Sequence, residues 1–300
     1  MSAALLVCDW GSTHLRAWTL DRDHAVVARA EFRLGVNALA PGEAAQRFHN
    51  EVRRQLNAAE LPALLCGAIG SNVGWQAVPY VACPAGLDDI VSGLTEVAPR
   101  VRIAPGLCCE GLGGAPDVLR GEETKAMGWL AGDPARARGR HLLCEPGTHS
   151  KWLVIEDGGV VRFLSAFTGE MYAVLSSASI LKSDGQVHDL AAFDAGMAAA
   201  EEGDALLNRI YTARSRVAAG EAASDTTGSY LSGVLIGAEV AATPRLLGLE
   251  GEPVILLADE PQRGLYVRAL ARRGVAVTLA DAEPAALAGL IAIARQRGLP

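Results

Sequence analysis

The sequence predicts an α/β fold made of two similar lobes. Two observations carry this prediction: one short pattern occurs twice, and strand-like segments are mixed with helix-like segments in each half of the chain. Residues 6–13 read LVCDWGST, and residues 142–149, at a constant offset of 136 residues, read LLCEPGTH. Each copy is an apolar strand followed by a glycine turn with hydroxyl side chains. The repeat therefore indicates a duplicated fold with a ligand site between its lobes.

The first half opens with an antiparallel meander. Apolar and alternating residues predict strands over 4–8, 14–20 and 25–32, and the polar turn 21–24 separates the last two. The pattern then predicts a helix over 42–58, buried strands over 62–66 and 101–104, a glycine-rich loop over 67–75 and a helix over 121–131. The stretch 106–117 is predicted to be a loop, because it holds four glycines and a proline.

The second half repeats the meander and continues with helices. Strands are predicted over 141–144, 151–156 and 160–166, and helices over 169–182, 190–218 and 227–242. Buried strands at 253–258 and 275–279 flank a helix at 261–273, and a last helix covers 284–297. The segment 132–140, which ends one helix and then turns basic, is the predicted linker, so the lobes are expected to be 1–138 and 139–300.

Composition excludes several classes of protein. Of the 300 residues, 50% are hydrophobic and 20% charged, enough for a large core. The formal charge of -7 and the lack of a basic stripe argue against a nucleic-acid partner. No apolar stretch approaches the roughly 20 residues that span a membrane, and the chain enters a strand at once, so we expect no membrane partner, no signal peptide and a cytoplasmic location. The six cysteines form no C-x-x-C pair and are expected to be reduced.

The first copy of the repeat is a candidate phosphate-binding hairpin. Asp9 at the strand end would hold a Mg²⁺-bound water, and Gly11, Ser12 and Thr13 would wrap a terminal phosphate through amide and hydroxyl donors. The alternative is an ordinary hairpin turn with small residues. The matched second copy favours the phosphate interpretation.

The second copy offers a similar set of groups. Gly147, Thr148 and Ser150 could donate to inner phosphates, and Lys151 supplies a compact positive charge. The alternative is a tight hairpin with a surface lysine. His149 is expected to be a solvated turn histidine rather than a ligand, because no metal-ligand spacing accompanies it.

The string Arg120-Gly121-Glu122-Glu123-Thr124-Lys125 stands at a loop-to-helix junction. A carboxylate here could accept the proton of an alcohol that is being phosphorylated, and a helix start favours its ionised form. The alternative is a solvated acidic first turn, which is common in helices.

Two further segments have both functional and structural interpretations. The loop 70–75 offers Ser71, Asn72 and the ring of Trp75 to a polar small molecule, or is a structural glycine loop in which Trp75 fills the core. The segment 229–239, with 258–261 later in the chain, holds small residues that allow close approach of a nucleoside or of a neighbouring helix.

Acid-x-Gly-hydroxyl hairpins in both halves resemble those of the superfamily of actin-like ATPases, hexokinases and heat-shock chaperone ATPases. More closely, the chain resembles the 2-dehydro-3-deoxygalactonokinase family. The strings that carry the resemblance run in order over nearly the whole chain: Asp9-Trp-Gly-Ser-Thr, Leu15-Arg-Ala-Trp18, Gly70-Ser-Asn-Val-Gly-Trp75, Pro79-Tyr80, Pro105-Gly-Leu-Cys108, Arg120-Gly-Glu-Glu-Thr124, Pro146-Gly-Thr-His-Ser-Lys-Trp152, Thr168-Gly-Glu170 and Leu231-Ser-Gly-Val-Leu-Ile-Gly-Ala-Glu239.

The resemblance implies ATP-dependent phosphorylation of the 6-hydroxyl of 2-dehydro-3-deoxy-D-galactonate, in galactonate breakdown, with ATP and Mg²⁺ as cofactors. It implies two ribonuclease-H-like lobes that close on a cleft, with the sugar acid on the first lobe and the nucleotide on the second. The last helix is expected to pack back on the first lobe. The general base corresponds to Glu123, with Glu122 as its neighbour. The sequence departs from the family pattern at Asp259-Glu260-Pro261, where small residues are usual.

These expectations assign a role to each candidate residue. Asp9 and Glu123 are catalytic, and Asp9 also positions Mg²⁺ through water. The residues predicted to bind ATP are Gly11, Ser12, Thr13, Gly147, Thr148, Ser150, Lys151, Gly233 and Asp259. The residues predicted to bind the sugar acid are Arg16, Ser71, Asn72, Trp75 and Arg120, an arginine being suited to a carboxylate.

Other functions stay open at this point. They are a kinase for another keto-deoxy or aldonic acid, a non-catalytic sugar-acid sensor on the same fold, and a filament-forming ATPase. The size of the chain and the sugar-kinase strings disfavour the last, and the retained Glu123 disfavours the sensor. The sequence leaves a monomer and a homodimer equally open.

Overall fold

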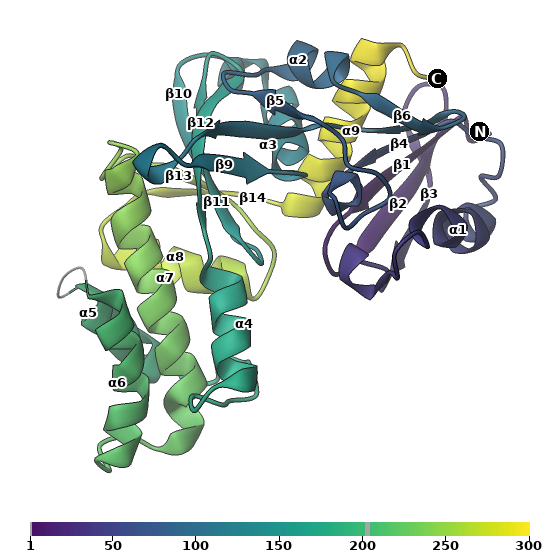
Figure 1. Ribbon diagram of the computed structural model, residues 1–300. Helices are drawn as coiled ribbons and strands as arrows, with labels where there is room; N and C mark the ends of the chain where they lie inside the picture. The colour runs from purple at the N-terminus through teal and green to yellow at the C-terminus, as the bar shows by residue number, and fades with distance from the viewer. Residues whose placement is uncertain (1, 202–204) are drawn as a thin grey trace. The chain divides into compact units, whose positions relative to one another are not determined.

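The computed structural model describes residues 2–201 and 205–300 and contains three β-sheets and surrounding helices (Figure 1). The chain divides into two compact units. Unit 1 holds the residues up to Arg140 together with Val154–Phe163 and Asp281–Pro300, and unit 2 holds His141–Leu153 and Leu164–Ala280.

The largest sheet has six strands in the order β3-β2-β1-β4-β7-β6. The predicted meander is confirmed as β1 (Leu5–Trp10), β2 (Leu15–Leu20) and β3 (Val26–Phe32), which pair antiparallel. The predicted buried strands are β4 (Ala63–Cys66) and β7 (Val101–Ile103), parallel to β1, and the edge strand β6 (Thr95–Ala98) runs antiparallel to β7. β1 and β4 are buried almost throughout, as expected for central strands covered on both faces.

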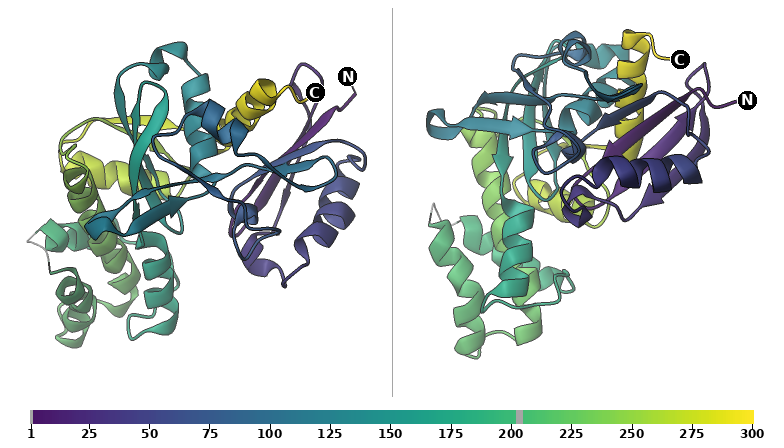
Figure 2. Two further views of the ribbon diagram at one scale, coloured as in Figure 1. Left: turned by 45° about the horizontal axis from the view of Figure 1, so that its top comes forward. Right: turned by 45° about the vertical axis from the view of Figure 1, so that its right-hand side comes forward.

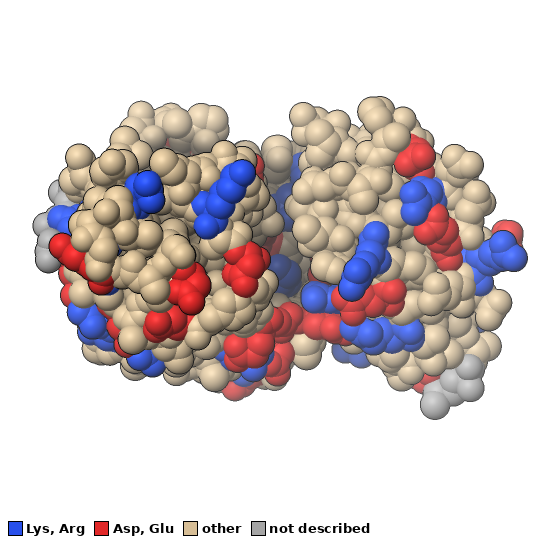
Figure 3. All heavy atoms as spheres, turned by 90° about the horizontal axis from the view of Figure 1, so that it is seen from below, with Lys and Arg blue, Asp and Glu red and all other residues tan. Residues whose placement is uncertain are grey.

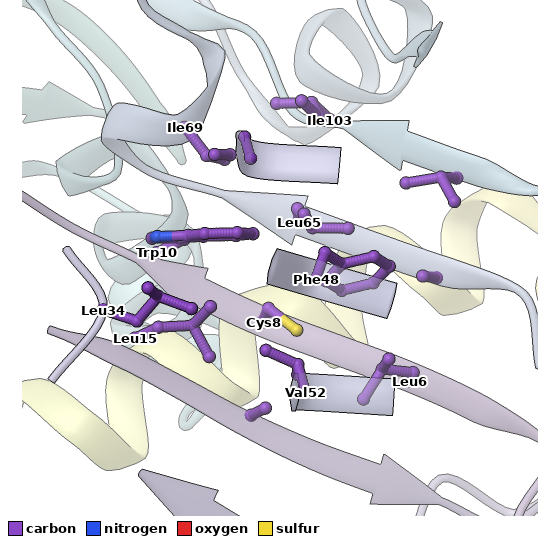
Figure 4. Close-up of a cluster of buried hydrophobic side chains, with 14 of the residues drawn as sticks. Leu6, Cys8, Trp10, Leu15, Leu34, Phe48, Val52, Leu65, Ile69 and Ile103 are labelled. Carbon is purple, nitrogen blue, oxygen red and sulfur yellow. The ribbon is translucent and has the colours of Figure 1, made fainter. Parts of the chain in front are cut away.

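One face of this sheet carries a core of large apolar side chains (Figure 4). Trp10 stacks on Phe48 with ring centroids 6.2 Å apart, beside Leu65 and Ile103. Phe48 lies where α1 (Ala44–Arg47) continues into a π-helical segment, Phe48–Arg53, so the helix predicted over 42–58 is present but not regular.

Two helices of unit 1 pack through reciprocal glycines. They are α3 (Glu122–Ala131) and α9 (Ala282–Arg297), which lie side by side in Figures 1 and 2. A Cβ on Gly128 would lie 1.8 Å from the carbonyl oxygen of Ala285, and one on Gly289 would lie 1.8 Å from that of Thr124. The two backbones can approach this closely only because both positions lack side chains. The same helix α9 contacts β1, β4 and α2 (Leu87–Ser92).

The prediction of a loop over 106–117 is wrong. The structure has a hairpin there, β8 (Gly106–Glu110) and β9 (Pro116–Leu119), which forms a three-stranded sheet with β5 (Tyr80–Ala82). Gly113 and Gly114, with positive φ, make the turn, whereas Gly106 belongs to the strand, where a Cβ would lie 2.3 Å from the carbonyl oxygen of Leu119. The number of glycines in the segment does not distinguish a glycine that makes a turn from one that allows a close contact within a strand.

The third sheet repeats the topology of the first. Its order is β12-β11-β10-β13-β14, which matches β3-β2-β1-β4-β7, and in both sheets the last three strands are parallel. Its strands are β10 (Arg140–Glu145), β11 (Ser150–Glu156), β12 (Gly159–Ala166), β13 (Val254–Leu257) and β14 (Val277–Ala280). The duplication read from the sequence thus extends over five strands, and the α/β prediction is confirmed.

The helices of unit 2 are α4 (Thr168–Ala178), α5 (Leu190–Glu201), α6 (Leu206–Ala218), α7 (Thr227–Leu246) and α8 (Gln262–Arg272). The single helix predicted over 190–218 is wrong, because α5 ends at Glu201 and Ala205 is not helical. Residues 202–204 of that prediction lie outside the described residues. Glycines again allow one contact to be close: a Cβ on Gly196 would lie 2.1 Å from the carbonyl oxygen of Tyr230, and one on Gly233 would lie 2.0 Å from that of Phe193.

Within the described ranges, no helix combines the length and apolar character needed to cross a bilayer. Lys and Arg side chains are interspersed with Asp and Glu on the face shown in Figure 3, as the mixed composition predicts.

Candidate active site

Asp9 stands at the end of β1, where several charged groups meet. Its partner across the antiparallel pair is Arg16, whose Nη1 lies 3.9 Å from Oδ2, and the thiol of Cys66 lies 3.9 Å from Oδ1. Burial raises the pKa of Asp9, and the positive charges of Lys125 and Arg16 oppose that shift. The negative charge of Glu122 raises the pKa further. Gly67 contacts both regions, since a Cβ on Gly67 would lie 3.4 Å from Oδ1 of Asp9 and a Cβ on Gly121 would lie 3.0 Å from the Cα of Gly67.

Backbone hydrogen bonds from a later loop hold the turn after Asp9 in place. The amide of Asn37 donates to the carbonyl oxygen of Ser12 (3.1 Å), and the amide of Gly35 donates to that of Thr13 (3.1 Å). A Cβ on Gly35 would lie 2.2 Å from the Ser12 oxygen, so only glycine allows this contact. The carbonyl groups are thereby satisfied, while Ser12 is half-buried and Thr13 and His14 are exposed. Thr13, whose hydroxyl lies 3.1 Å from Nδ1 of His14, is therefore accessible to an anion.

Two adjacent carboxylates begin α3 and differ in exposure. Glu123 is fully buried and accepts hydrogen bonds from the amide of Gly121 (2.6 Å) and the hydroxyl of Thr124 (2.8 Å). Burial and the charge of Glu122 raise the pKa of Glu123 to about 7. Glu122 is half-buried, and one of its oxygens accepts from the amide of Arg120 (3.0 Å). Of the two, Glu122 is therefore the carboxylate that a ligand can reach.

Arg120 carries a guanidinium that is only partly satisfied. Its Nη2 donates to the carbonyl oxygen of Val78 (2.6 Å), and its charged plane lies 4.3 Å from the ring centroid of Tyr80. Its Nε and Nη1 are buried without a hydrogen-bond partner among the described residues, and the same holds for the hydroxyl of Ser71. The guanidinium contacts the loop that carries Ser71, since a Cβ on Gly70 would lie 2.9 Å from Nη1.

The other predicted substrate residues have different surroundings. Arg16 lies within an acidic cluster, 3.8 Å from Glu31 and 3.7 Å from Glu283 as well as close to Asp9. Trp75 packs on Phe48 with ring centroids 5.4 Å apart. This contact agrees with the alternative in which Trp75 fills the core instead of binding a ligand. Asn72 is exposed in the same loop as Ser71.

In the second hairpin, the turn is exposed and the strand that follows is buried. Gly147 and Thr148 are exposed, whereas Ser150 and Lys151 are buried. The start of α4 supports this turn closely: the amide of Glu170 donates to the carbonyl oxygen of Thr148 (2.8 Å). The imidazole of His149, in the same turn, lies 2.6 Å from the carboxylate of Glu170 and stacks on Phe167. The hydroxyl of Ser150 faces away from the turn and bonds that of Tyr266 (2.8 Å).

A cavity of about 360 Å³ in unit 2 begins at this turn. Its walls include Gly147, Thr168, Tyr172, Ser232 and Tyr266, and its floor is largely apolar. A concave apolar site with a few polar groups suits a nucleoside. Of the predicted ATP residues in unit 2, Gly147 lines it, whereas Thr148, Ser150, Lys151, Gly233 and Asp259 do not. Gly233 faces α5, and Asp259 is half-buried beside Arg263 (3.9 Å).

Sequence reasoning missed several residues of this cavity. Ser232 lies in the string Leu231-Ser-Gly and could have been selected for its hydroxyl. Tyr172 and Tyr266 carry no local signal, because nothing in their neighbourhoods distinguishes them from core aromatics.

A family model described as 2-keto-3-deoxy-galactonokinase matches residues 9–293. The 2-dehydro-3-deoxygalactonokinase of Escherichia coli (strain K12) is 32% identical over 296 residues, and the match covers 98% of both chains. A protein of Rhizobium meliloti (strain 1021), named as a probable 2-dehydro-3-deoxygalactonokinase, is 35% identical over 302 residues, with 96% of this chain and 95% of the relative covered.

Solved structures agree with the sequence relatives. A crystal structure from Sinorhizobium meliloti, provisionally described as a 2-dehydro-3-deoxygalactonokinase, has a TM-score of 0.83 at 32% identity and covers 97% of this chain and 98% of its own. The activator of 2-hydroxyisocaproyl-CoA dehydratase from Clostridium difficile, solved with ADPNP, has a TM-score of 0.50 at 13% identity over 99% of this chain and 96% of its own, which shows a shared fold alone. The chain belongs to the 2-dehydro-3-deoxygalactonokinase family.

Proposed function

We propose that the chain is an ATP-dependent kinase that phosphorylates the 6-hydroxyl of 2-dehydro-3-deoxy-D-galactonate to give the 6-phosphate, in galactonate breakdown. Family membership over the whole length of the chain supports the activity. The observation that carries the mechanism is the pair of carboxylates at the start of α3, next to Asp9. Phosphoryl transfer to an alcohol needs an acceptor for the hydroxyl proton and groups that neutralise the transferring phosphate.

Glu122 is the better placed of the two carboxylates to take the hydroxyl proton. The resemblance favoured Glu123, but Glu123 is 0% exposed and both of its oxygens already accept hydrogen bonds. A general base must come within hydrogen-bond reach of the proton that it removes. We assign that role to Glu122, and assign to Glu123 the role of holding the first turn of α3.

The sugar acid is held through its carboxylate by Arg120. Among the described residues, two nitrogens of this guanidinium and the hydroxyl of Ser71 have no acceptor, and a carboxylate would satisfy these donors. Asn72, in the same loop, is exposed and able to bind a hydroxyl of the sugar. Arg16 is engaged by three carboxylates and is assigned to keeping Asp9 ionised.

In unit 2, the cavity takes the nucleoside of ATP, and Gly147 and Thr148 hold inner phosphates. In unit 1, Ser12 and Thr13 keep their predicted role of holding the terminal phosphate. Lys151 is 6% exposed beside the second turn and adds positive charge there. Ser150, whose hydroxyl bonds Tyr266, supports the turn from beneath rather than binding a phosphate.

The residues fit a water-mediated magnesium ion. The described ranges contain no group of three or more His, Cys, Asp and Glu side chains that could hold a metal directly. Mg²⁺ commonly keeps most of its waters and takes one or two carboxylates, so Asp9 at a strand end suffices for it. When bound, the ion neutralises charge on the phosphates.

Consumption of ATP also favours a cytoplasmic location.

The test is an ADP-release assay with Mg-ATP and a panel of sugar acids that includes both C4 epimers of 2-dehydro-3-deoxy-hexonate. Strong turnover of the galacto epimer alone supports the proposal. Turnover of another acid would indicate a kinase of different specificity, and nucleotide binding without turnover of any acid would indicate a sensor.

A further inference from the structure

Helix α7 carries a buried carboxylate that the proposed reaction does not use. Glu239 is 5% exposed and is the one charged side chain among the buried residues that the structure describes on this helix. Burying a carboxylate is costly unless hydrogen bonds compensate it. Its retention in an apolar helix therefore needs a structural or functional reason.

The carboxylate of Glu239 accepts hydrogen bonds from side chains on separate elements. Nε1 of Trp152 donates to one oxygen and the hydroxyl of Tyr266 donates to the other, both at 2.8 Å. The hydroxyl of Thr168 bonds the same carboxylate. The hydroxyl of Ser150 lies 2.8 Å from that of Tyr266 and also bonds the carboxylate of Glu239. Side chains from β11, α4 and α8 thus converge on this one carboxylate.

These donors are also parts of the nucleotide cavity. Thr168 and Tyr266 line it directly, from the start of α4 and from α8. Ser150 and Trp152 are the first and third residues of β11, which follows the exposed turn 147–149. The carboxylate of Glu239 therefore connects β11, which follows the turn 147–149, to two walls of the cavity.

We infer that Glu239 is a positioning residue for the nucleotide: its buried carboxylate fixes β11, α4 and α8 at the spacing that the nucleoside and inner phosphates require. This inference rests on the proposed function, because it takes the cavity to be the ATP site. Glu239 itself touches no substrate atom in this scheme and acts through Tyr266 and Thr168.

The chain offers a matched pair of tyrosines for a test. Tyr266 is 2% exposed and Tyr230 is 4% exposed, and each hydroxyl makes a 2.8 Å hydrogen bond, Tyr230 with Thr212 between α6 and α7. Tyr230 does not line the nucleotide cavity. Tyr266→Phe therefore removes the two hydrogen bonds of a buried hydroxyl in the network, and Tyr230→Phe removes one hydrogen bond of a buried hydroxyl elsewhere in unit 2.

Each variant of the full chain is assayed for binding of ADP by calorimetry and for the KM of ATP and of the sugar acid. We expect Tyr266→Phe to weaken ADP binding and raise the KM of ATP about tenfold, the scale of one lost hydrogen bond to a charged group, and to leave the KM of the sugar acid unchanged. Tyr230→Phe should change neither constant. Glu239→Gln should act like Tyr266→Phe but more strongly, because one donor would then face an amide nitrogen.

Unchanged ADP binding in Tyr266→Phe, or equal weakening in Tyr230→Phe, would overturn the inference. A parallel rise in both KM values would also overturn it, since that would indicate general loosening of the fold. If the wild-type protein binds ADP, phosphorylates no sugar acid and still shows the tyrosine contrast, the positioning role of Glu239 holds and the proposed reaction fails.

Discussion

The buried carboxyl of Glu123 should make the stability of the protein fall as pH rises. Its pKa is about 7 in the folded chain against 4.5 for a free glutamate. The folded state therefore holds this proton more tightly than the unfolded state does. The resulting stabilisation is complete below pH 4.5 and is lost as the pH rises through 7.

The magnitude follows from the two pKa values. Relative to low pH, the linkage costs the folded state about 1 kcal/mol at pH 5 and about 3 kcal/mol at pH 8. In Glu123→Gln the amide cannot ionise, and its oxygen and nitrogen can pair with the amide of Gly121 and the hydroxyl of Thr124. The stability of the variant relative to wild type should thus increase by about 2–3 kcal/mol between pH 5 and pH 8.

Urea unfolding of both proteins at pH 5 and pH 8, followed by circular dichroism, measures this difference. Other titrating groups are common to both proteins and cancel in the comparison. An exposed carboxylate, changed in Glu96→Gln, gives the control and should show no pH-dependent difference. If the curves of Glu123→Gln and wild type run parallel across pH, the carboxyl of Glu123 does not hold a proton at neutral pH and the argument from its burial is refuted.

Three further predictions concern unit 1. Glu122→Gln should lower kcat by roughly 10²-fold or more with little change in the KM of ATP, and an unchanged rate in the ADP-release assay would remove Glu122 from the role of base. Arg120→Met should raise the KM of the sugar acid by about 10- to 100-fold, the scale of a lost charged hydrogen bond, whereas the surface change Arg102→Met should not; equal effects would contradict a carboxylate site. Gly289→Ala should lower the free energy of unfolding by at least about 1–3 kcal/mol, since its Cβ would meet a backbone oxygen at 1.8 Å. The control Gly264→Ala, whose Cβ meets only a flexible side chain at 3.3 Å, should not destabilise the protein. Thermal unfolding compares the two variants.

Local patterns predicted most of the strands and the exposed turns. The meanders alternate apolar residues and end in glycine turns, so β1 to β3 and β10 to β12 were predicted almost to the residue. The hairpin β8–β9 was missed because its glycines serve both a turn and a close strand contact, and no count of residue types distinguishes these uses.

Contacts that join distant parts of the chain could not be predicted. Trp152 and Glu239 are 87 residues apart, and Ser150 and Tyr266 are 116 apart, so no spacing rule relates them. The resemblance pointed to Glu123 as the base, with Glu122 as its neighbour, and the residue types alone do not distinguish the two carboxylates. Their difference in burial depends on how the start of α3 packs near Gly67, which is a tertiary property.

The interlocked glycines of α3 and α9 have a consequence for synthesis of the protein. Unit 1 begins at the N-terminus, yet its helix α9 ends at Arg297. Domains tend to fold as units while the chain leaves the ribosome. Here the helix that bears Glu122 lacks its packing partner until α9, which follows unit 2 in the sequence, has been translated, whereas unit 2 is complete at Ala280. The second unit should therefore reach its native packing first, and the nascent first unit should expose the uncovered face of α3 in the meantime.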